Sequence, residues 1–372
     1  MLIGIDSSRA NKQKKTGVEW YSYHLIEQFK KIDKENQFFL YTNVPLKGEL
    51  GNCPENFKEK LLKWPIPRSW TIGRLSLEMM KKNKPDLLFV PSHTLPLINP
   101  KKAVVTIHDI GFEHFPSAYH WADKFYHKLI IKIIKRSADK IIAVSKFTKD
   151  DIVKTYKINP DKIEVIWNGY DSDKYKKIEN AKAKLKEKYN ITDDFILFIG
   201  RLELKKNIPR LIEAFAKFKK RHNQDNHKLV LVGTKGLTFP LVEEQIKKYN
   251  LADQIIFPGW IPDDDLPTFL SASDLFVFPS LFEGFGIPVI EAMACECPVI
   301  CSKTTSLPEV AGEAALMFDP ENVDEIVARI EQVVLNETVS ESLITKGLER
   351  ITYFSWEKCA RETLDFLLTI KE

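Results

Sequence analysis

No run of 18 apolar residues occurs in this 372-residue sequence, so no membrane-spanning helix is expected. A leader with a charged start and a short apolar core is missing too, because Met1–Asp6 already has the pattern of a buried strand. We therefore expect a protein that is neither membrane-spanning nor secreted, with a cytoplasmic location. The composition, with 44% hydrophobic and 28% charged residues, is typical of a globular protein of two or three domains.

Cysteines are few, and their number and spacing argue against a disulfide framework. An odd number in no regular pattern fits a reducing compartment. Cys297 and Cys301 bracket a short strand-like segment with no histidine or fourth cysteine nearby. Packing in the core is therefore preferred over a metal site for these thiols. The five cysteines are Cys53, Cys295, Cys297, Cys301 and Cys359.

Three further patterns are missing, and each absence narrows the class of protein. No tandem repeat of solenoid length occurs, which argues against a repeat architecture. No Gly-x-Gly-x-x-Gly follows the first predicted strand, so a dinucleotide cofactor site is not indicated there. The sequence contains no recognisable Ser-His-Asp set, so a hydrolase triad is not indicated. We expect no cofactor.

Charge is distributed unevenly along the chain. Residues 1–167 carry 29 Lys and Arg against 18 Asp and Glu, for a net charge of +11, whereas the remainder carries −7. The two halves should therefore meet different partners. Within the basic half, Trp121–Ser137 has the pattern of a basic amphipathic helix. Its lysines suit anionic lipid head groups at the inner face of the plasma membrane, but an ordinary outer helix of a sheet has the same pattern, because Lys and Arg stems cover apolar surface.

Strand-like and helix-like segments alternate throughout, which predicts α/β architecture with mostly parallel, doubly wound sheets. The first series of strands is expected at Leu2–Asp6, Phe38–Thr42, Asp86–Val90, Ala103–His108, Lys140–Val144 and Ile163–Trp167. The second is expected at Phe195–Gly200, Lys228–Gly233, Gln254–Trp260, Leu275–Pro279, Pro298–Cys301 and Ala314–Phe318. A turn signal at 168–171 lies between them. We predict two domains, 1–168 and 171–354, with a last amphipathic helix at 355–372.

Two carboxylates eight residues apart form the most informative feature. Glu283 lies in a loop after the predicted strand Leu275–Pro279, and Glu291 is expected in the first turn of the following helix, which Pro288 would begin. Gly284 and Gly286 let backbone N–H groups approach a ligand closely. The helix N-terminus offers donors to a phosphate. A hydroxyl-rich group on each side of a phosphate is the layout of a nucleotide-sugar.

A second cluster follows the strand Phe195–Gly200. Gly200 and Arg201 lie at its carboxyl end, the edge where open α/β sheets bind ligands, and Lys206 follows in the loop. Two cations there suit a diphosphate whose charge grows as it leaves. Lys205 is an adjacent competitor for the role of Lys206.

The residues around the two carboxylates, Phe-Pro-Ser-x-x-Glu-Gly-Phe-Gly-x-Pro-x-x-Glu-Ala-Met-Ala, resemble the Glu-x7-Glu motif of retaining GT-B glycosyltransferases of family four, in their mannosyltransferase-like branch. Gly-Arg-Leu-x-x-x-Lys-Asn resembles the phosphate-binding segment of the same family. The resemblance implies the GT-B fold, two Rossmann-like domains facing a cleft, with the last helix crossing back onto the N-terminal domain. The N-terminal domain would then take the acceptor and the C-terminal domain the nucleotide-sugar.

The resemblance also implies roles for single residues. Glu283 would hold the sugar hydroxyls and Glu291 the ribose, while Arg201, Lys206 and Gly17 would meet the phosphates. His108, in a His-Asp-x-x-Phe stretch, would lie near the reacting carbon. The implied catalytic set is Glu283, His108, Arg201 and Lys206. The implied donor-binding set is Gly17, Gly200, Gly233, Ile261, Gly284, Phe285, Gly286, Ile287 and Glu291. Trp260 would flank the base or, equally, fill the core.

No metal site is expected. Asp171-Ser-Asp173 formally matches the Asp-x-Asp motif of metal-dependent glycosyltransferases, but it lies at the turn near 168–171 that is the predicted hinge between the two domains. Asp263-Asp-Asp265 has the pattern of acidic residues before a helix, where they favour the N-terminus. Arg201 and Lys206 would take the place of a metal.

The activity implied is transfer of a hexose from a nucleoside-diphosphate sugar, with a lean to GDP-mannose, to a hydroxyl of a glycan or lipid-linked acceptor. The resemblance implies a front-face mechanism with retention, in which the leaving phosphate oxygen acts as the base. A nucleotide-sugar 2-epimerase of the same fold and a non-catalytic glycan-assembly subunit are the alternatives. No nucleic-acid partner is expected. The sequence leaves the acceptor, linkage, nucleotide and oligomeric state open.

Overall fold

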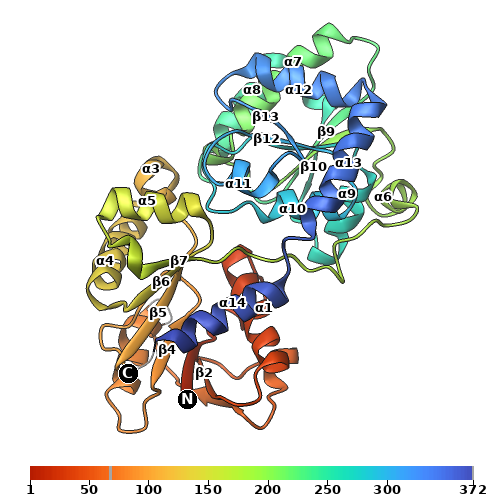
Figure 1. Ribbon diagram of the computed structural model, residues 1–372. Coiled ribbons are helices and arrows are strands. Elements are labelled where there is room, and N and C mark those ends of the chain that lie inside the picture. The colour runs from red at the N-terminus through yellow and green to blue at the C-terminus, as the bar shows by residue number, and fades with distance from the viewer. Residues whose placement is uncertain (67–68, 371–372) are drawn as a thin grey trace. The chain divides into compact units, whose positions relative to one another are not determined.

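The computed structural model describes residues 1–66 and 69–370, so the last two residues of the helix expected at 355–372 lie outside the described residues. The chain divides into two compact units (Figure 1). The first comprises Met1–Glu113, His120–Gly169 and Ser355–Glu372, and the second comprises His114–Tyr119 and Tyr170–Phe354. The short segment 114–119 thus clusters with the second unit, which the sequence did not predict.

The first unit is built on one parallel sheet with the strand order β3-β2-β1-β4-β5-β6-β7 among the described residues. Its central strands are buried on both faces, as expected for a sheet covered by helices (Figure 1). The strands are β1 (Leu2–Asp6), β2 (Gln37–Thr42), β3 (Phe57–Leu61), β4 (Leu87–Val90), β5 (Lys102–Ile107), β6 (Lys140–Ala143) and β7 (Ile163–Val165).

The helices of this unit begin at recognisable caps. Thr16 and Glu19 form a reciprocal capping box at the start of α1, which satisfies donors that a helix start leaves unpaired. Ser145 caps α5 by accepting a hydrogen bond from the Thr148 N–H. The helices are α1 (Gly17–Ile32), α2 (Ser76–Met79), α3 (Gly111–His114, whose last residue clusters with the second unit), α4 (Trp121–Ser137), α5 (Lys146–Tyr156) and α14 (Trp356–Thr369).

The last helix, α14, packs against α1 within the first unit. The Trp356 ring stacks on His24, with ring centroids 4.9 Å apart. A Cβ added to Gly169 would lie 2.2 Å from the Trp356 backbone nitrogen, so the chain crosses itself closely here. Only a residue without a side chain fits at this crossing.

The second unit repeats the architecture with the strand order β10-β9-β8-β11-β12-β13, all parallel among the described residues. The predicted α/β architecture of two doubly wound parallel sheets is therefore confirmed. The strands are β8 (Phe195–Ile199), β9 (Lys228–Val232), β10 (Ile255–Gly259), β11 (Leu275–Phe278), β12 (Val299–Ser302) and β13 (Leu316–Phe318).

Helices cover this second sheet as well (Figure 1). Most carry one apolar face; in α7, for example, Leu211, Phe215 and Phe218 are buried at helical spacing. The helices are α6 (Ala181–Tyr189), α7 (Ile208–Arg221), α8 (Phe239–Tyr249), α9 (Leu266–Ala272), α10 (Ile287–Ala294), α11 (Leu307–Ala311), α12 (Val323–Val334) and α13 (Glu337–Ile351). Among the described residues, no helix has both the length and the apolar character needed to cross a membrane.

The cysteines pack as expected from the sequence. All five are free thiols, and four of them, Cys295, Cys297, Cys301 and Cys359, are buried. Burial raises the pKa of Cys301 to about 12, so it is held as a neutral thiol. A packing role for the three thiols at 295–301 is therefore supported.

Candidate active site

The strand order of the second unit creates one topological switch point, between β8 and β11. Chain connections run outward from β8 in one direction and from β11 in the other, so the loops that leave these two strands diverge and open a crevice at the carboxyl edge. The two clusters predicted from the sequence follow these two strands. Residues 200–206 follow β8, and residues 279–286 follow β11.

Gly200 and Gly233 bring two loops into backbone contact beside this crevice. Both have positive φ, 153° and 144°, and a Cβ added to Gly233 would lie 1.9 Å from the carbonyl oxygen of Gly200. Neither position therefore tolerates a side chain without backbone movement. The predicted donor-binding residues Gly200 and Gly233 thus have a demonstrable packing reason to be glycine.

Lys206 and Glu283 form an ion pair across the switch point. The Lys206 Nζ lies 2.5 Å from the Glu283 Oε1, and both side chains are largely buried, at 18% and 12% exposed. Because water is largely excluded, the Coulomb attraction between these two charges is stronger than in a surface ion pair. Two residues that the sequence placed in separate clusters 77 positions apart are therefore one charged group in the fold.

Lys205 and Arg201 occupy different surroundings. The Lys205 backbone carbonyl accepts a hydrogen bond from the Leu281 N–H, and the Lys205 ammonium lies 5.5 Å from the centroid of the Phe282 ring. Arg201 is 55% exposed, and its Nε lies 3.5 Å from Glu203. Lys206 rather than Lys205 thus contacts Glu283, while Arg201 remains an exposed cation at the same strand end.

Two residues that sequence reasoning missed hold the Glu283 loop. Glu283 donates its N–H to the Thr305 hydroxyl at 3.3 Å. The Ser306 hydroxyl, fully buried, lies 3.0 Å from the Glu283 carbonyl oxygen and 2.8 Å from that of Phe285. Thr305 and Ser306 follow β12, the strand next to β11. The only sequence signal was a run of hydroxyl residues at a strand end.

Helix α10 begins at Ile287 with Gly286 as its N-cap, at a φ of 107°. Pro288 is therefore the second helical residue. Glu291 is the fifth, so the expectation that it lies in the first turn is wrong. Because the dipole effect fades within the first turn, it contributes little to Glu291.

The pKa of Glu291 is instead set mainly by burial. Burial raises its pKa to about 7, and a hydrogen bond from Tyr175 and the nearby Lys174 only partly oppose that shift. Tyr175, from a segment with no apolar periodicity, was missed by the sequence. A carboxyl group that titrates near neutral pH beside a crevice is typical of functional sites.

The remaining predicted donor-binding residues divide between buried and exposed positions. Phe285 and Ile261 are buried, at 4% and 3% exposed, and Ile287 is half-buried. Gly284 is buried in the loop between Glu283 and Phe285. Trp260 is 53% exposed, so the alternative that it fills the core is wrong.

The two candidates in the first unit lie at a strand end and at a helix start, respectively. His108 follows β5, is half-buried, and has its Nε2 3.2 Å from the Pro91 carbonyl oxygen. Burial lowers its pKa, so the ring is neutral at pH 7. Gly17 is the first residue of α1, and nothing lies within 4 Å of where a Cβ would be. That open space beside a helix start suits backbone contact with an anion.

The charged side chains near Gly17 form ion pairs with one another. Glu19 pairs with Arg9 at 3.3 Å and with Lys12 at 2.9 Å. Although burial opposes it, hydrogen bonds from Thr16 and Lys12 lower the Glu19 pKa to about 2. Glu19 therefore holds the loop before α1 in place at neutral pH.

The acidic segments 171–173 and 263–265 are engaged in local structure. Asp171 accepts hydrogen bonds from the N–H groups of Asp173 and Lys174, which is a turn. Asp265 pairs with Lys188 and accepts a hydrogen bond from Tyr189. Both carboxylates thus have protein partners that account for their positions without a metal ion.

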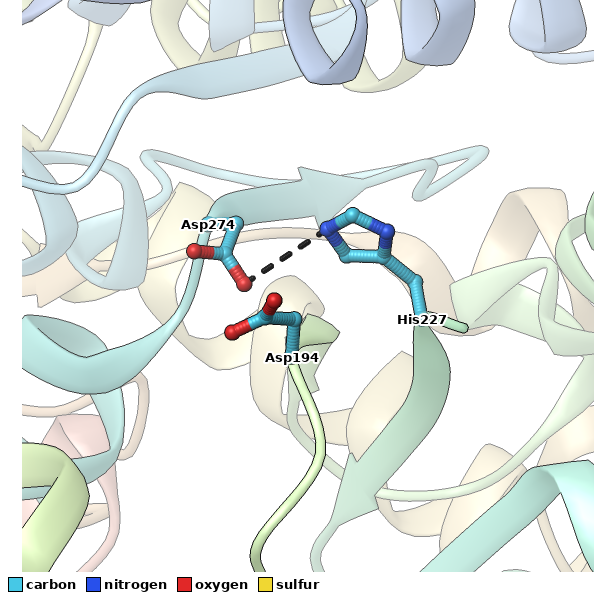
Figure 2. A group of neighbouring side chains, drawn as sticks. All are labelled: Asp194, His227 and Asp274. Carbon is cyan, nitrogen blue, oxygen red and sulfur yellow. Dashed lines mark ion pairs between the residues drawn. The ribbon is translucent and has the colours of Figure 1, made fainter. Parts of the chain in front are cut away.

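A different group, Asp194, His227 and Asp274, brings potential metal ligands within 4.8 Å of one another (Figure 2). Each residue immediately precedes a strand, β8, β9 or β11, so the group lies at the amino ends of the sheet, opposite the crevice. The Lys182 ammonium lies 2.5 Å from Asp194 and 3.1 Å from Asp274. Because a cation already bridges the two carboxylates, we interpret the group as an ion-pair network joining three strands.

Fold and site together define a class of protein: a GT-B glycosyltransferase. Two family models match, Glycosyltransferase Family 4 over residues 16–174 and Glycosyl transferases group 1 over residues 179–350. The structure of sucrose-phosphate synthase from Thermosynechococcus elongatus superposes with a TM-score of 0.79 at 20% identity, covering 100% of this chain and 99% of that one.

Sequence relatives narrow the class. The O-antigen chain mannosyltransferase B of Escherichia coli is 33% identical over 71% of this chain and 70% of its own length. The serotype-specific mannosyltransferase WbdA of Escherichia coli is 31% identical over 61% of this chain, which spans 28% of WbdA. The chain therefore belongs to the family of group 1 glycosyltransferases, and it is a glycosyltransferase enzyme.

Proposed function

We propose that this enzyme transfers a hexose, with retention of configuration, from a nucleoside-diphosphate sugar to a hydroxyl of a glycan or lipid-linked acceptor. The observation that carries the proposal is the Lys206–Glu283 pair at the switch point, where α/β sheets bind ligands. Mannose is the first sugar to test, because both of these relatives in sequence are mannosyltransferases. GDP-mannose is accordingly the first donor.

The pair suits a donor that carries both charge and hydroxyls. Before the donor arrives, Lys206 neutralises Glu283, which avoids an uncompensated buried carboxylate. An incoming diphosphate offers Lys206 a stronger anion, and the sugar offers Glu283 hydroxyl donors in exchange. Binding of the donor thus replaces one ion pair with two sets of contacts, one to the phosphate and one to the sugar.

The catalytic contribution is charge stabilisation at the leaving group. Lys206 and the exposed Arg201 would meet the diphosphate, whose negative charge grows as the glycosidic bond breaks. In a front-face reaction the acceptor hydroxyl attacks from the same side, and a leaving phosphate oxygen takes its proton. Glu291 and the backbone at Gly200, Gly233 and Gly286 would hold the nucleotide. His108, neutral at pH 7, would contact the sugar.

A panel of nucleotide-sugars tests the donor. A ligand at a hundred times its dissociation constant stabilises the folded protein by about 2.7 kcal/mol, which is a measurable rise in melting temperature. We expect GDP-mannose to give the largest rise. No rise with any nucleoside-diphosphate sugar would defeat the proposal.

The reaction type is tested by incubating the stabilising donor with and without acceptor. A transferase requires the acceptor, and the anomeric configuration of its product, read by NMR, should match that of the donor. Conversion of the donor alone to its 2-epimer would show an epimerase instead.

A further inference from the structure

Helix α4 presents an apolar stripe to solvent. Trp121 is 71% exposed, Phe125 is 70% exposed and Leu129 is 43% exposed. The three residues are spaced four apart, so they line one side of the first two and a half turns. Single exposed apolar residues are common on proteins, but three in one stripe, two of them aromatic, are the pattern of an interaction site.

The stripe is not part of the core of the first unit. The face of α4 that packs inward carries Ile130, Ile131 and Ile134, all 3% exposed or less. At about 100° per residue, Phe125 projects about 180° away from Ile134 around the helix axis. The helix is therefore anchored by one apolar face and leaves a second apolar face outside. An ordinary outer helix, one of the two alternatives from the sequence, would carry polar residues there.

Basic residues continue the same outer face toward the end of the helix. Lys132 and Arg136 lie within about 20° of Phe125 and Leu129, respectively, around the axis. Both are exposed, as is Lys128, whose Nζ is 3.5 Å from Glu113. The α4 outer face, which we define as Trp121, Phe125, Leu129, Lys128, Lys132 and Arg136, thus combines aromatic and cationic groups.

We propose that the α4 outer face binds the surface of a bilayer containing anionic lipids. Aromatic side chains with a polar atom, such as Trp121, favour the interface between head groups and acyl chains. Lys132 and Arg136 meet lipid phosphates there, and their stems extend along the apolar surface. The net charge of +11 over residues 1–167 attracts the same surface over a longer range.

The composition favours lipid over a protein partner. Protein interfaces are depleted in lysine at their centres, whereas on this face Lys128 and Lys132 follow the exposed aromatics within two turns of the same helix. A helix of 17 residues, anchored inward by three isoleucines, lies along the surface rather than across it. The bound helix would therefore insert only its Trp121, Phe125 and Leu129 side chains.

Co-sedimentation with vesicles tests the contribution of the apolar residues of the α4 outer face. The full-length protein is mixed at low salt with phosphatidylcholine vesicles containing about one-third phosphatidylglycerol, without any nucleotide-sugar. The double variant Trp121→Ser/Phe125→Ser should reduce the vesicle-bound fraction at least tenfold. The matched control is Leu237→Ser in the second unit, where Leu237 is 63% exposed. This control should bind like the native protein.

A second pair of variants tests the charge. Lys132→Gln/Arg136→Gln should lower the partition coefficient by about 25-fold, because each basic residue near the surface contributes about fivefold, or about 1 kcal/mol. Lys247→Gln/Lys248→Gln on α8 removes the same charge from an exposed site of the second unit and should have little effect. Salt at about 0.5 M should abolish the difference between native protein and variant.

Three outcomes would overturn the proposal. Native protein that does not sediment with anionic vesicles is one, and equal binding by the Trp121→Ser/Phe125→Ser variant is another. The third is self-association without lipid, detected by sedimentation velocity and lost in the same variant, which would assign the face to a second copy of the chain. Far-ultraviolet circular dichroism and melting temperature confirm that the variants fold. Because no donor is present, failure here leaves the proposed transferase activity untouched.

Discussion

At the scale of single residues, the two carboxylates differ in what holds them. Glu283 is paired with Lys206, whereas Glu291 accepts a hydrogen bond from Tyr175 and has a raised pKa. If Glu283 contacts the sugar and Glu291 contacts the ribose, replacing each residue should change a different kinetic parameter. Interactions with the reacting sugar strengthen as the bond breaks, but contacts to the ribose are the same in ground and transition states.

Glu283→Gln should therefore lower kcat strongly and Glu291→Gln should mainly raise KM for the donor. Calorimetry with the bare nucleoside diphosphate separates the roles most cleanly, because this ligand lacks the sugar. Glu283→Gln should bind it as tightly as the native protein or more tightly, since Lys206 is released to contact the phosphate. Glu291→Gln should bind it weakly. Equal binding by both variants would show that the two roles are assigned wrongly.

The Glu291 carboxyl predicts a pH dependence of stability. Its pKa of about 7 in the folded protein lies above the value in an unfolded chain, so the folded protein holds a proton that the unfolded chain releases. The stability linked to this proton is complete below the unfolded pKa, near 4.5, and is lost as the pH rises through 7. Glu291→Gln, which resembles the protonated form, removes this loss.

Urea unfolding at pH 5 and pH 8 checks this expectation. The native protein should be less stable than Glu291→Gln at pH 8, and the gap should narrow at pH 5. Tyr175→Phe, without the hydrogen bond that opposes the shift, should keep the pH dependence and steepen it. A gap that stays constant between the two pH values would mean that Glu291 titrates normally.

A third expectation at this scale concerns metal. Arg201 and Lys206 supply cations at the proposed phosphate site, and Asp171 is engaged in a turn. Activity should therefore survive EDTA, and Asp171→Asn should change turnover by less than about twofold. Loss of activity in EDTA that Mn²⁺ or Mg²⁺ restores would contradict the first statement, and a larger loss of turnover in Asp171→Asn would contradict the second. The Asp194–His227–Asp274 group would then be the first place to look, with His227→Ala as the test.

The sequence singled out Glu283, Lys206 and Glu291 as candidates but did not predict their partners. Their surroundings share a strong local pattern, because glycines, a strand end and a helix start are all encoded within a few residues. The Lys206–Glu283 contact depends instead on β8 and β11 being neighbours, which no local pattern encodes. Tyr175 lies in a segment without periodicity, and Thr305 and Ser306 act through a third loop.

At the scale of elements, the same limit explains which strands were missed. β3, Phe57–Leu61, has two lysines and a glutamate in five residues, so it contains no apolar run that would predict a strand. It lies at the edge of its sheet, where charged residues discourage pairing with other chains. Helix α6 was missed for a similar reason, since only Ala181 and Leu185 are buried. Elements with little buried surface carry little periodicity.

The same substitution, Gly→Ala, should affect stability at one glycine, Gly169, and not at another, Gly17. Gly169→Ala places a Cβ 2.2 Å from the Trp356 backbone, so α14 or the 168–171 segment must shift. We expect a loss of about 1–3 kcal/mol of stability, as for other overpacked sites. Gly17→Ala meets open space, so it should leave stability within about 0.5 kcal/mol.

Activity separates the two glycines further. If the Gly17 backbone approaches the donor phosphate, Gly17→Ala should raise the KM for the donor while the melting temperature stays unchanged. Gly169→Ala should lower the melting temperature, and the protein that remains folded at low temperature should still bind the donor. A Gly17→Ala variant with native kinetics would remove Gly17 from the site.

At the scale of the whole molecule, each unit has its own sheet and its own buried core. The chain passes between the two units from Gly169 to Tyr170 and from Phe354 to Ser355. It also does so on either side of the segment 114–119, which belongs to the second unit. Units with separate cores need not unfold together, so a single two-state transition is not expected. A ligand stabilises only the unit to which it binds.

Differential scanning calorimetry of the native chain should therefore resolve two transitions, and saturating nucleoside diphosphate should raise mainly one of them. We assign that one to the second unit, because Lys206, Glu283 and Glu291 all belong to it. Lys206→Ala should abolish the rise, whereas Lys132→Gln on α4, in the first unit, should preserve it. If the ligand raised both transitions equally in the native protein and in Lys206→Ala, the nucleotide would not bind at the β8–β11 switch point.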